Sequence, residues 1–324
     1  MDAPEFIARL REGDRRALAR SITHVEADTA IGRAILKGIY PHTGRAITIG
    51  VTGSAGVGKS TMVAALAREQ RRRGRTVGIV AVDPSSPFSN GAILGDRIRM
   101  QGLTSDGGVF MRSMASRGNL GGLSEMATGV VDLMDAAGFD VIILETVGAG
   151  QDEVVVATAT STTVLVTTPG GGDEIQSMKA GLMEIAQVMV VNKADLAGSD
   201  TAVMQLKALL AIAAARSWEP PILKVVARDD EGLEALVDAI DRHQTHIRES
   251  EHAEAERRAL VQSQIVALAR ASIERHALAT AREQGVLAGL VEEVAARRRD
   301  PRDAAEALVE AVRVHWGRDA AALD

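Results

Sequence analysis

Short apolar runs alternate with longer segments of helical periodicity along most of this chain. The intervening segments at 60–73, 123–137, 173–185 and 201–217 fit helices. Strands that alternate with helices predict an α/β fold whose mostly parallel sheet is covered by helices on both faces. The strand runs are rich in valine and isoleucine, and they lie at Ala46–Val51, Thr76–Val82, Val109–Met111, Asp140–Leu144, Thr163–Val166, Val188–Val191 and Ile222–Val226.

Both ends of the chain read as helical. The spacing of apolar residues predicts helices over 5–20 and 22–39, with Ser21 as the N-cap between them. From residue 249 onward Ala, Glu, Arg and Leu dominate, which predicts a long helix over 251–283 and two shorter ones over 287–299 and 302–315. Asp300-Pro301 fits the N-cap and first position of the last helix. We therefore expect three parts, at 1–44, 45–248 and 249–324, and a second copy of the chain as the partner of the last part.

Composition narrows the classes of function. Hydrophobic residues make up 46% of the 324 residues and aromatic residues only 2%, so the core must be aliphatic. The chain has no cysteine, which excludes disulfides and thiolate metal sites. The net charge of −6 argues against nucleic acid as the main partner. The N-terminus is acidic, and no apolar stretch reaches the ~18 residues of a membrane span. We expect a cytoplasmic protein without a signal peptide and without a membrane partner.

One stretch has the pattern of a phosphate-binding loop. Gly53–Ser60 reads G-x-x-x-x-G-K-S between a predicted strand and a predicted helix, which is the context that a P-loop requires. Its backbone N–H groups and the helix N-terminus would surround phosphate oxygens. Lys59 would reach the β- and γ-phosphates, and the Ser60 hydroxyl would bind Mg²⁺. The predicted phosphate-binding residues are Gly53, Ser54, Ala55, Gly56, Val57, Gly58, Lys59, Ser60 and Thr61.

A second motif predicts which base is bound. Asn192, Lys193 and Asp195 form N-K-x-D directly after the predicted strand at 188–191. The Asp195 carboxylate can accept hydrogen bonds from N1–H and the exocyclic amine of guanine, a pair of donors that adenine lacks. Asn192 and Lys193 would brace the loop and cover the ring. The motif predicts GTP and GDP as ligands.

Three acidic residues follow strands or lie in glycine-rich connections. They are Asp83, Asp96 and Glu145, and Gly148 completes an E-x-x-G sequence that begins at Glu145. Carboxylates beside a P-loop can bind Mg²⁺ and orient the attacking water, while the N–H of Gly148 can contact the γ-phosphate. The alternative for each carboxylate is the capping of a turn. The glycine-rich connections around them predict loops that reorganise when the γ-phosphate leaves.

Two further patterns suggest a binding site but have simpler explanations. Arg71–Arg73 closes the helix that follows the P-loop, where basic residues complement the helix dipole, so we do not interpret it as a nucleic-acid patch. His243 and His246 lie three residues apart on a helix. Without cysteines nearby, we expect a solvated helix face and no metal site.

Taken together, these motifs resemble the MeaB/ArgK/MMAA family of P-loop GTPases, the chaperones of adenosylcobalamin-dependent acyl-CoA mutases. The resemblance covers almost the whole chain and goes beyond general GTPase motifs. The stretches that carry it are Gly50–Thr61, Asp83–Pro87, Gly91–Met100, Arg112–Ser113, Arg117–Ser124, Glu145–Gln151, Lys179–Ile185 and Val191–Asp195.

The resemblance implies a P-loop NTPase fold of the SIMIBI kind and a homodimer formed by the C-terminal helices. It implies a slow GTPase that gates cofactor loading and protects a partner mutase, with an adenosyltransferase as a possible member of the loading complex. Mg²⁺ would be bound by Ser60, Asp96 and Glu145, and Ala227 would stand at the guanine contact. No cobalamin is expected on this chain itself. Two alternatives stay open: a transport-system kinase and a metal-insertion GTPase.

Overall fold

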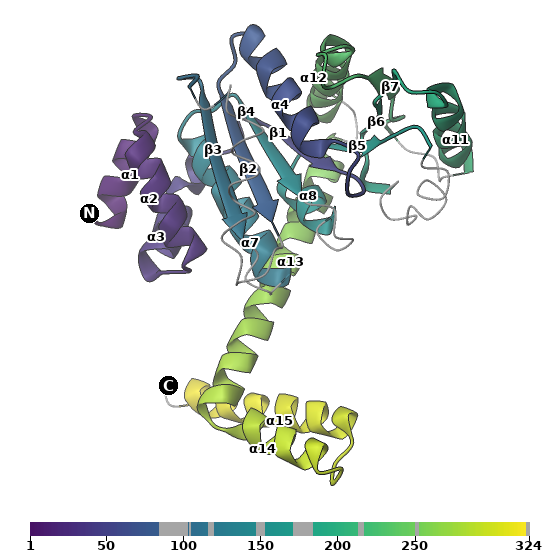
Figure 1. Cartoon of the computed structure of the whole chain (residues 1–324). Coiled ribbons are helices and arrows are strands. Elements are labelled where there is room, and N and C mark those ends of the chain that lie inside the picture. The colour runs from purple at the N-terminus through teal and green to yellow at the C-terminus, as the bar shows by residue number, and fades with distance from the viewer. Residues whose placement is uncertain are drawn as a thin grey trace. The chain divides into compact units, whose positions relative to one another are not determined.

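In the computed structural model, the described residues form one sheet of seven parallel strands (Figure 1). The structure describes residues 1–83, 103, 105–115, 120–146, 153–170, 184–212, 217–249 and 253–321. The strand order across the sheet is β3-β2-β4-β1-β5-β6-β7, and the predicted parallel α/β fold is confirmed. The strands are β1 (Ile47–Thr52), β2 (Val77–Asp83), β3 (Val109–Ala115), β4 (Val141–Thr146), β5 (Thr162–Thr167), β6 (Val188–Asn192) and β7 (Ile222–Val225).

Helices cover both faces of this sheet because successive strand residues point to opposite sides. Ile143 of β4 packs in a cluster with α4 (Lys59–Arg72) and α12 (Leu233–Glu249). Its neighbours Ile142 and Leu144 pack on the other side with α7 (Leu120–Ala136) and α8 (Glu153–Ala159). A third cluster joins α11 (Ser199–Ile212) to β5 and β6. The sequence pattern did not predict the short helix α8.

The N-terminal region consists of three helices, so the prediction of two helices was wrong. They are α1 (Ala3–Arg11), α2 (Arg15–Glu26) and α3 (Ala30–Ile39), followed by a short 3-10 helix, η1 (Tyr40–His42). Asp14 caps α2 by accepting hydrogen bonds from the N–H groups of Arg16 (2.8 Å) and Ala17 (3.1 Å). Ser21, predicted to be an N-cap, is buried in the middle of α2. The N-caps Asp14 and Thr29 therefore set where α2 and α3 begin, although the helical spacing of apolar residues continues across both positions.

The N-terminal helices belong to the same hydrophobic cluster as one face of the sheet. Phe6 of α1 and Ile35 of α3 pack in the cluster that contains Val80 of β2 and Leu144 of β4. A carboxylate at the end of α7 fixes the chain where it enters β1: Asp135 accepts hydrogen bonds from the N–H groups of Gly44 (2.5 Å) and Ala46 (3.0 Å).

The end of the chain forms a separate helical unit. The chain divides into Met1–Gln264 and Ile265–Asp324, and the second unit holds the end of α13 (Ala253–Glu283), α14 (Val286–Ala295) and α15 (Pro301–Ala321). Asp300 accepts a hydrogen bond from the N–H of Arg302 (2.8 Å), which confirms the predicted cap of the last helix. The domain boundaries expected at residues 44 and 248 stay predictions. None of the described helices combines the length and apolarity needed to span a bilayer.

Candidate functional site

The loop between β1 and α4 has a backbone that only glycine adopts readily at three positions. Gly53, Gly56 and Gly58 have φ angles of +145°, +82° and +94°. Space is also restricted: a Cβ on Gly53 would lie 2.1 Å from the Val166 carbonyl oxygen, and a Cβ on Gly58 would lie 2.6 Å from Nδ2 of Asn192. The glycines of the predicted P-loop are therefore required by conformation and, at two of them, by packing.

Lys59 is the first residue of α4 and is buried, with 6% of its surface exposed. Its Nζ donates to the carbonyl oxygens of Gly53 and Ser54, at 2.8 Å each. The ammonium group thus lies within the loop, beside the N-terminus of the helix, where both charges attract an anion. Ser54, Ala55, Gly56 and Val57 form the loop itself, and Ser60 and Thr61 follow Lys59 in the first turn of α4.

Ser60 and Glu145 meet at the carboxyl edge of the sheet. The Ser60 hydroxyl donates to Oε1 of Glu145 at 2.6 Å, and Glu145 is 6% exposed near the end of β4. Glu145 pairs in register with Val51 of β1 and Ala81 of β2, which places it between the P-loop strand and the strand that ends at Asp83. Hydroxyl and carboxylate oxygens are the kind of ligand that Mg²⁺ prefers, so these two neighbouring residues fit the predicted ion.

Of the other residues predicted near Mg²⁺ and the γ-phosphate, the structure describes only Asp83. Asp83 is the last residue of β2, the neighbour of β4 in the sheet. Asp96 and Gly148 lie outside the described residues.

Asn192 connects the end of β6 to the P-loop. Its Nδ2 donates to the carbonyl oxygen of Val57 at 2.8 Å, and its Oδ1 accepts from the N–H of Ala227 at 3.2 Å. Lys193, with a φ of +55°, donates from Nζ to the carbonyl oxygen of Gly56 at 2.9 Å. The two motifs are more than 130 residues apart in the chain, and the structure brings them together as the parallel sheet predicts.

Asp195 lies at the outer edge of this group, with 41% of its side chain exposed. Nη2 of Arg228 is 3.7 Å from a carboxylate oxygen of Asp195 and 2.9 Å from one of Asp229. The hydrogen bond from Arg228 lowers the pKa of Asp229, so this carboxylate is ionised at neutral pH. Sequence reasoning did not name Arg228 as a site residue. Its position directly after the predicted strand that ends at Val226 was the available signal.

The two histidines of α12 do not form a solvated face, so that prediction was wrong. His243 is 5% exposed, its Nδ1 lies 2.8 Å from the Thr162 hydroxyl, and its ring centroid lies 5.0 Å from that of Trp218. Burial and, to a smaller extent, the nearby His246 lower the pKa of His243 to about 4. Among the described residues, no three His, Cys, Asp or Glu side chains gather into a metal site.

The family model of the methylmalonyl-CoA mutase-associated GTPase MeaB matches residues 18–282. The chain belongs to the MeaB family. A protein of Pyrococcus horikoshii is 47% identical over 265 residues, which cover 81% of this chain and 84% of the relative. The GTPase ArgK of Escherichia coli is 39% identical over 245 residues, covering 73% and 74% of the two chains.

A solved structure extends the likeness to nearly the whole MeaB-family chain. The crystal structure titled LAO/AO transport system kinase is 27% identical, with a TM-score of 0.71, and the match covers 96% of this chain and 97% of that one. Family and relatives together identify the activity: the chain is a GTPase, which hydrolyses GTP to GDP and phosphate. The loop at Gly53–Ser60 therefore belongs to a GTPase of the P-loop type.

Proposed function

We propose that this GTPase is a chaperone of an adenosylcobalamin-dependent acyl-CoA mutase of the methylmalonyl-CoA type. It gates cofactor loading and protects the loaded mutase from inactivation. The description of the matching family, which names methylmalonyl-CoA mutase, supports the client. The main structural support for control by the bound nucleotide is the Ser60–Glu145 hydrogen bond. It joins α4, the helix that follows the P-loop, to the strand that leads into residues 147–152.

In this proposal the P-loop side of the site carries the hydrolysis. Lys59 and the backbone N–H groups of the loop hold the β- and γ-phosphates and stabilise the charge that builds up between them. Ser60, Asp96 and Glu145 hold Mg²⁺, which neutralises phosphate charge when bound. Asp83 helps to orient the attacking water, and the N–H of Gly148 contacts the γ-phosphate. Asp96 and Gly148 enter the proposal from their sequence context alone.

The β6 side of the site selects the base. Asp195 accepts the two guanine donors, Lys193 covers the ring, and Ala227 stands at the far edge of the base. Asn192 supports this arrangement because it is 3% exposed and holds both the P-loop and the N–H of Ala227. A buried amide that satisfies two backbone groups is costly to disturb, so the base pocket and the phosphate loop keep a fixed spacing.

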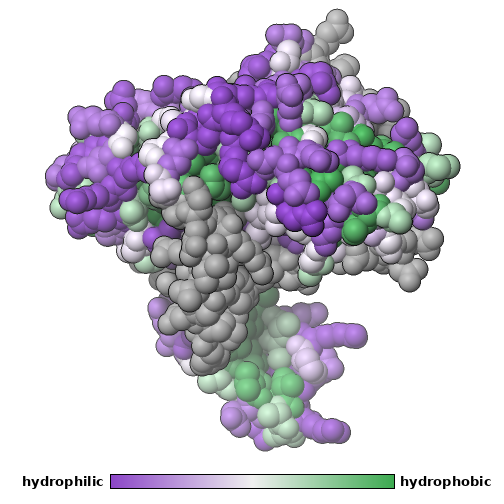
Figure 2. Space-filling model, turned by 45° about the horizontal axis from the view of Figure 1, so that its top comes forward, coloured by the Kyte–Doolittle hydropathy of each residue, from purple (hydrophilic) through white to green (hydrophobic). Residues whose placement is uncertain are grey.

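The proposal includes a homodimer formed through the C-terminal helices. Apolar side chains on these helices are exposed in the single chain, including Ile273 (59%), Val291 (55%) and Val309 (65%). Figure 2 shows apolar surface among the polar side chains of this helical unit. A helical unit with this much exposed apolar surface is expected to pack against a partner, and a second copy of the chain is the simplest one. An adenosyltransferase in the loading complex stays a prediction.

Protection of the mutase can be tested with the full-length chain. The loaded mutase turns over its substrate in the presence of this chain and GTP, and its remaining activity is measured over time. We expect the mutase to lose activity more slowly with the wild-type chain than with Lys59→Ala. Lys59 is buried, so this variant loses the proposed phosphate contact while the surface of the chain is nearly unchanged. Equal decay with both proteins would remove the support for the protective role.

A transport-system kinase is the second candidate, because the solved relative carries that title. The same P-loop chemistry would then transfer the γ-phosphate to a protein. Incubation with γ-labelled GTP separates the two: the chaperone proposal predicts label in free phosphate only, and a kinase predicts label on a partner protein. A metal-insertion GTPase lacks support, because the sequence has no cysteine to bind a soft metal ion.

A further inference from the structure

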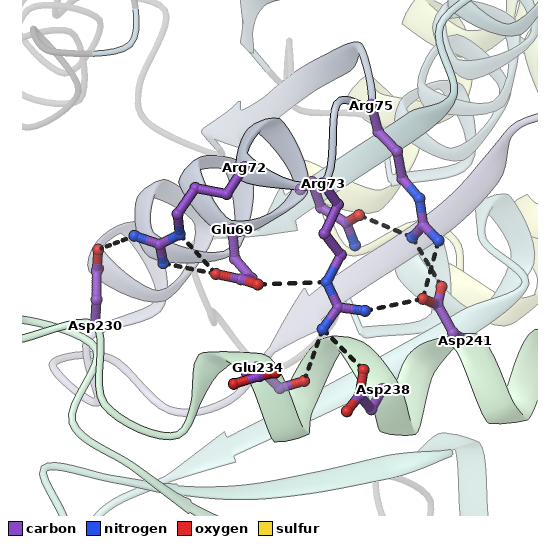
Figure 3. A network of polar contacts seen from close by, with 9 residues as sticks. Glu69, Arg72, Arg73, Arg75, Asp230, Glu234, Asp238 and Asp241 are labelled. Carbon is purple, nitrogen blue, oxygen red and sulfur yellow. Dashed lines mark hydrogen bonds and ion pairs between the residues drawn. The ribbon is translucent and has the colours of Figure 1, made fainter.

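The C-terminal half of α4 and the residues directly after it carry arginines that pair with acidic residues of later elements. Figure 3 shows Arg72, Arg73 and Arg75 reaching Asp230, Asp238 and Asp241. Two of these acids, Asp238 and Asp241, lie on α12, whereas Asp230 lies in the loop before it. The loop contact differs from the others because this loop also carries the residues at the proposed base pocket.

The loop at 226–231 is a closed turn. Val226 and Glu231 exchange backbone hydrogen bonds of 3.1 and 3.2 Å, and the N–H of Asp229 donates to the Val226 carbonyl oxygen at 3.0 Å. Asp230 has a φ of +59°, a left-handed conformation that is uncommon for a residue other than glycine. Aspartate tolerates this conformation better than most residues, but a contact that holds it still stabilises the turn.

Asp230 is held by the helix that begins at the P-loop. Arg68 donates to both carboxylate oxygens, from Nη2 at 2.6 Å and from Nε at 3.3 Å, and Arg72 adds a contact at 3.2 Å. A two-pronged guanidinium–carboxylate pair fixes direction as well as distance. The side chain of Asp230 is 26% exposed, so the pair is partly shielded from water. The hydrogen bond from Arg68 lowers the pKa of Asp230, which keeps it charged at neutral pH.

The other end of the same turn faces the base side of the site. The N–H of Ala227 is bound to Asn192, and Arg228 lies 3.7 Å from Asp195. One short turn is therefore fixed twice, by Asn192 at Ala227 and by Arg68 at Asp230. Arg68 is nine residues after Lys59 on α4, a rise of roughly 13 Å along the helix. The helix thus joins the phosphate loop to the base turn as a rigid spacer.

We propose that Arg68 and Asp230 are positioning residues for guanine recognition. They hold the turn 226–231 at a fixed distance from the P-loop, so that Ala227 and Arg228 meet the base while Lys59 meets the phosphates. This inference rests on the GTPase site and on the base pocket proposed above at Asp195 and Ala227. Neither Arg68 nor Asp230 touches the nucleotide in this account. Their effect is on base affinity and not on the chemical step.

The chain offers a matched control for this ion pair. Asp241 of α12 binds Arg75 at 2.8 and 2.9 Å and Arg73 at 3.3 Å, so it also ties α12 to the end of α4. It makes no contact with the turn 226–231 in the described structure. Loss of Asp241 therefore weakens the attachment of α12 to the segment at the end of α4, while the turn 226–231 keeps its contacts with Arg68 and Asn192.

The test measures binding of GDP and of pyrophosphate, with Mg²⁺, to Asp230→Asn and Asp241→Asn. Asparagine tolerates the left-handed backbone, so Asp230→Asn removes the charge without straining the turn. We expect Asp230→Asn to weaken GDP binding about tenfold, the loss of one charge-assisted hydrogen bond. Pyrophosphate, which has no base, binds unchanged. The KM for GTP rises and kcat at saturation stays the same. Asp241→Asn binds both ligands as the wild type does.

Three outcomes would overturn the proposal. GDP affinity within about twofold of wild type would show that the pair does not position the turn. Equal loss of GDP and pyrophosphate would show a general structural effect, as would a loss of GDP binding in Asp241→Asn. Arg68→Lys, which keeps the charge and loses the two-pronged geometry, gives a second reading if Asp230→Asn does not fold. Asp195→Ala separates this result from the base assignment: if it leaves GDP affinity unchanged, the proposed base pocket is wrong, independently of Arg68.

Discussion

Ser60, in the first turn of α4, donates a 2.6 Å hydrogen bond to Glu145, which lies 85 residues later near the end of β4. The contact links the first turn of α4 to the strand that precedes residues 147–152. A buried carboxylate in this place can accept a hydrogen bond from a hydroxyl or bind a cation, and its negative charge strengthens both interactions.

Replacing Glu145 by glutamine keeps the shape and removes the charge. We expect the rate of GTP hydrolysis to fall about 100-fold or more, because a preorganised charge at the metal side of the site is lost. GDP affinity without Mg²⁺ should change little. Phosphate release at saturating GTP measures the first effect, and titration with GDP in a chelator measures the second. A hydrolysis rate within threefold of wild type would show that Glu145 does not act in the site.

Asp195→Asn should change the base that is bound. The carboxamide presents one donor where the carboxylate presented only acceptors, so the donor pair of guanine loses its partner. Xanthine carries an oxygen in place of the exocyclic amine, and it accepts from the new donor. We expect GDP affinity to fall at least tenfold and xanthosine diphosphate affinity to rise. Unchanged GDP affinity would contradict the proposed base pocket.

Because Asp132 lies in a partly buried position on α7, we expect the stability of the fold to depend on pH. Burial and, to a smaller extent, the negative charge of Asp135 raise the pKa of Asp132 to about 7. The unfolded carboxyl ionises near 3.8, so the folded state binds the extra proton between these values, and stability is lost as pH rises toward 7. Asp132→Asn removes this loss. The difference in free energy of unfolding between Asp132→Asn and the wild type should therefore increase by up to about 4 kcal/mol, in favour of the variant, from pH 4 to pH 8.

Denaturant unfolding at several pH values checks this prediction. His243, with its pKa lowered to about 4, produces the opposite slope, because its unfolded form binds a proton below about 6.5. The informative quantity is therefore the difference between wild type and variant at each pH. A difference that does not vary with pH would mean that Asp132 is ionised in the folded protein.

The proposed dimer predicts the effect of a charge on α15. Val309 is 65% exposed, so Val309→Glu should leave the fold of one chain intact and disrupt packing against a second chain. Sedimentation should then show a monomer where the wild type sediments as a dimer. Glu306→Gln, an exposed polar change on the same helix, serves as the control. A dimer that survives Val309→Glu would place the contact elsewhere.

The strands and the meeting of the two nucleotide motifs could be predicted because they follow from local patterns. Strands that are buried on both faces of a sheet consist of unbroken runs of valine and isoleucine, which can be recognised in the sequence. Because the strands are parallel, their carboxyl ends bring Asn192 and the P-loop to one edge of the sheet. The helix boundaries near Asp14 could not be predicted in the same way, because a polar cap interrupted an apolar period that continued through it.

The Arg68–Asp230 pair and the burial of His243 depend on packing between distant elements. Arg68 reads as one more basic residue on a helix, and nothing in the sequence shows that Asp230 lies opposite it. His243 and His246 follow a polar spacing that suits a solvated helix, but Trp218 covers them in the fold. Contacts of this kind are set by the three-dimensional arrangement and leave no periodic signal.

In the proposed function, nucleotide state controls binding to a cobalamin-dependent acyl-CoA mutase. The direct measurement is sedimentation of the full-length chain with methylmalonyl-CoA mutase, in GDP and in a non-hydrolysable GTP analogue, with Lys59→Ala as the control. We expect a complex whose affinity differs between the two nucleotides by about tenfold or more, a difference that Lys59→Ala abolishes. The absence of a complex in either state, or one equally tight in both, would contradict it.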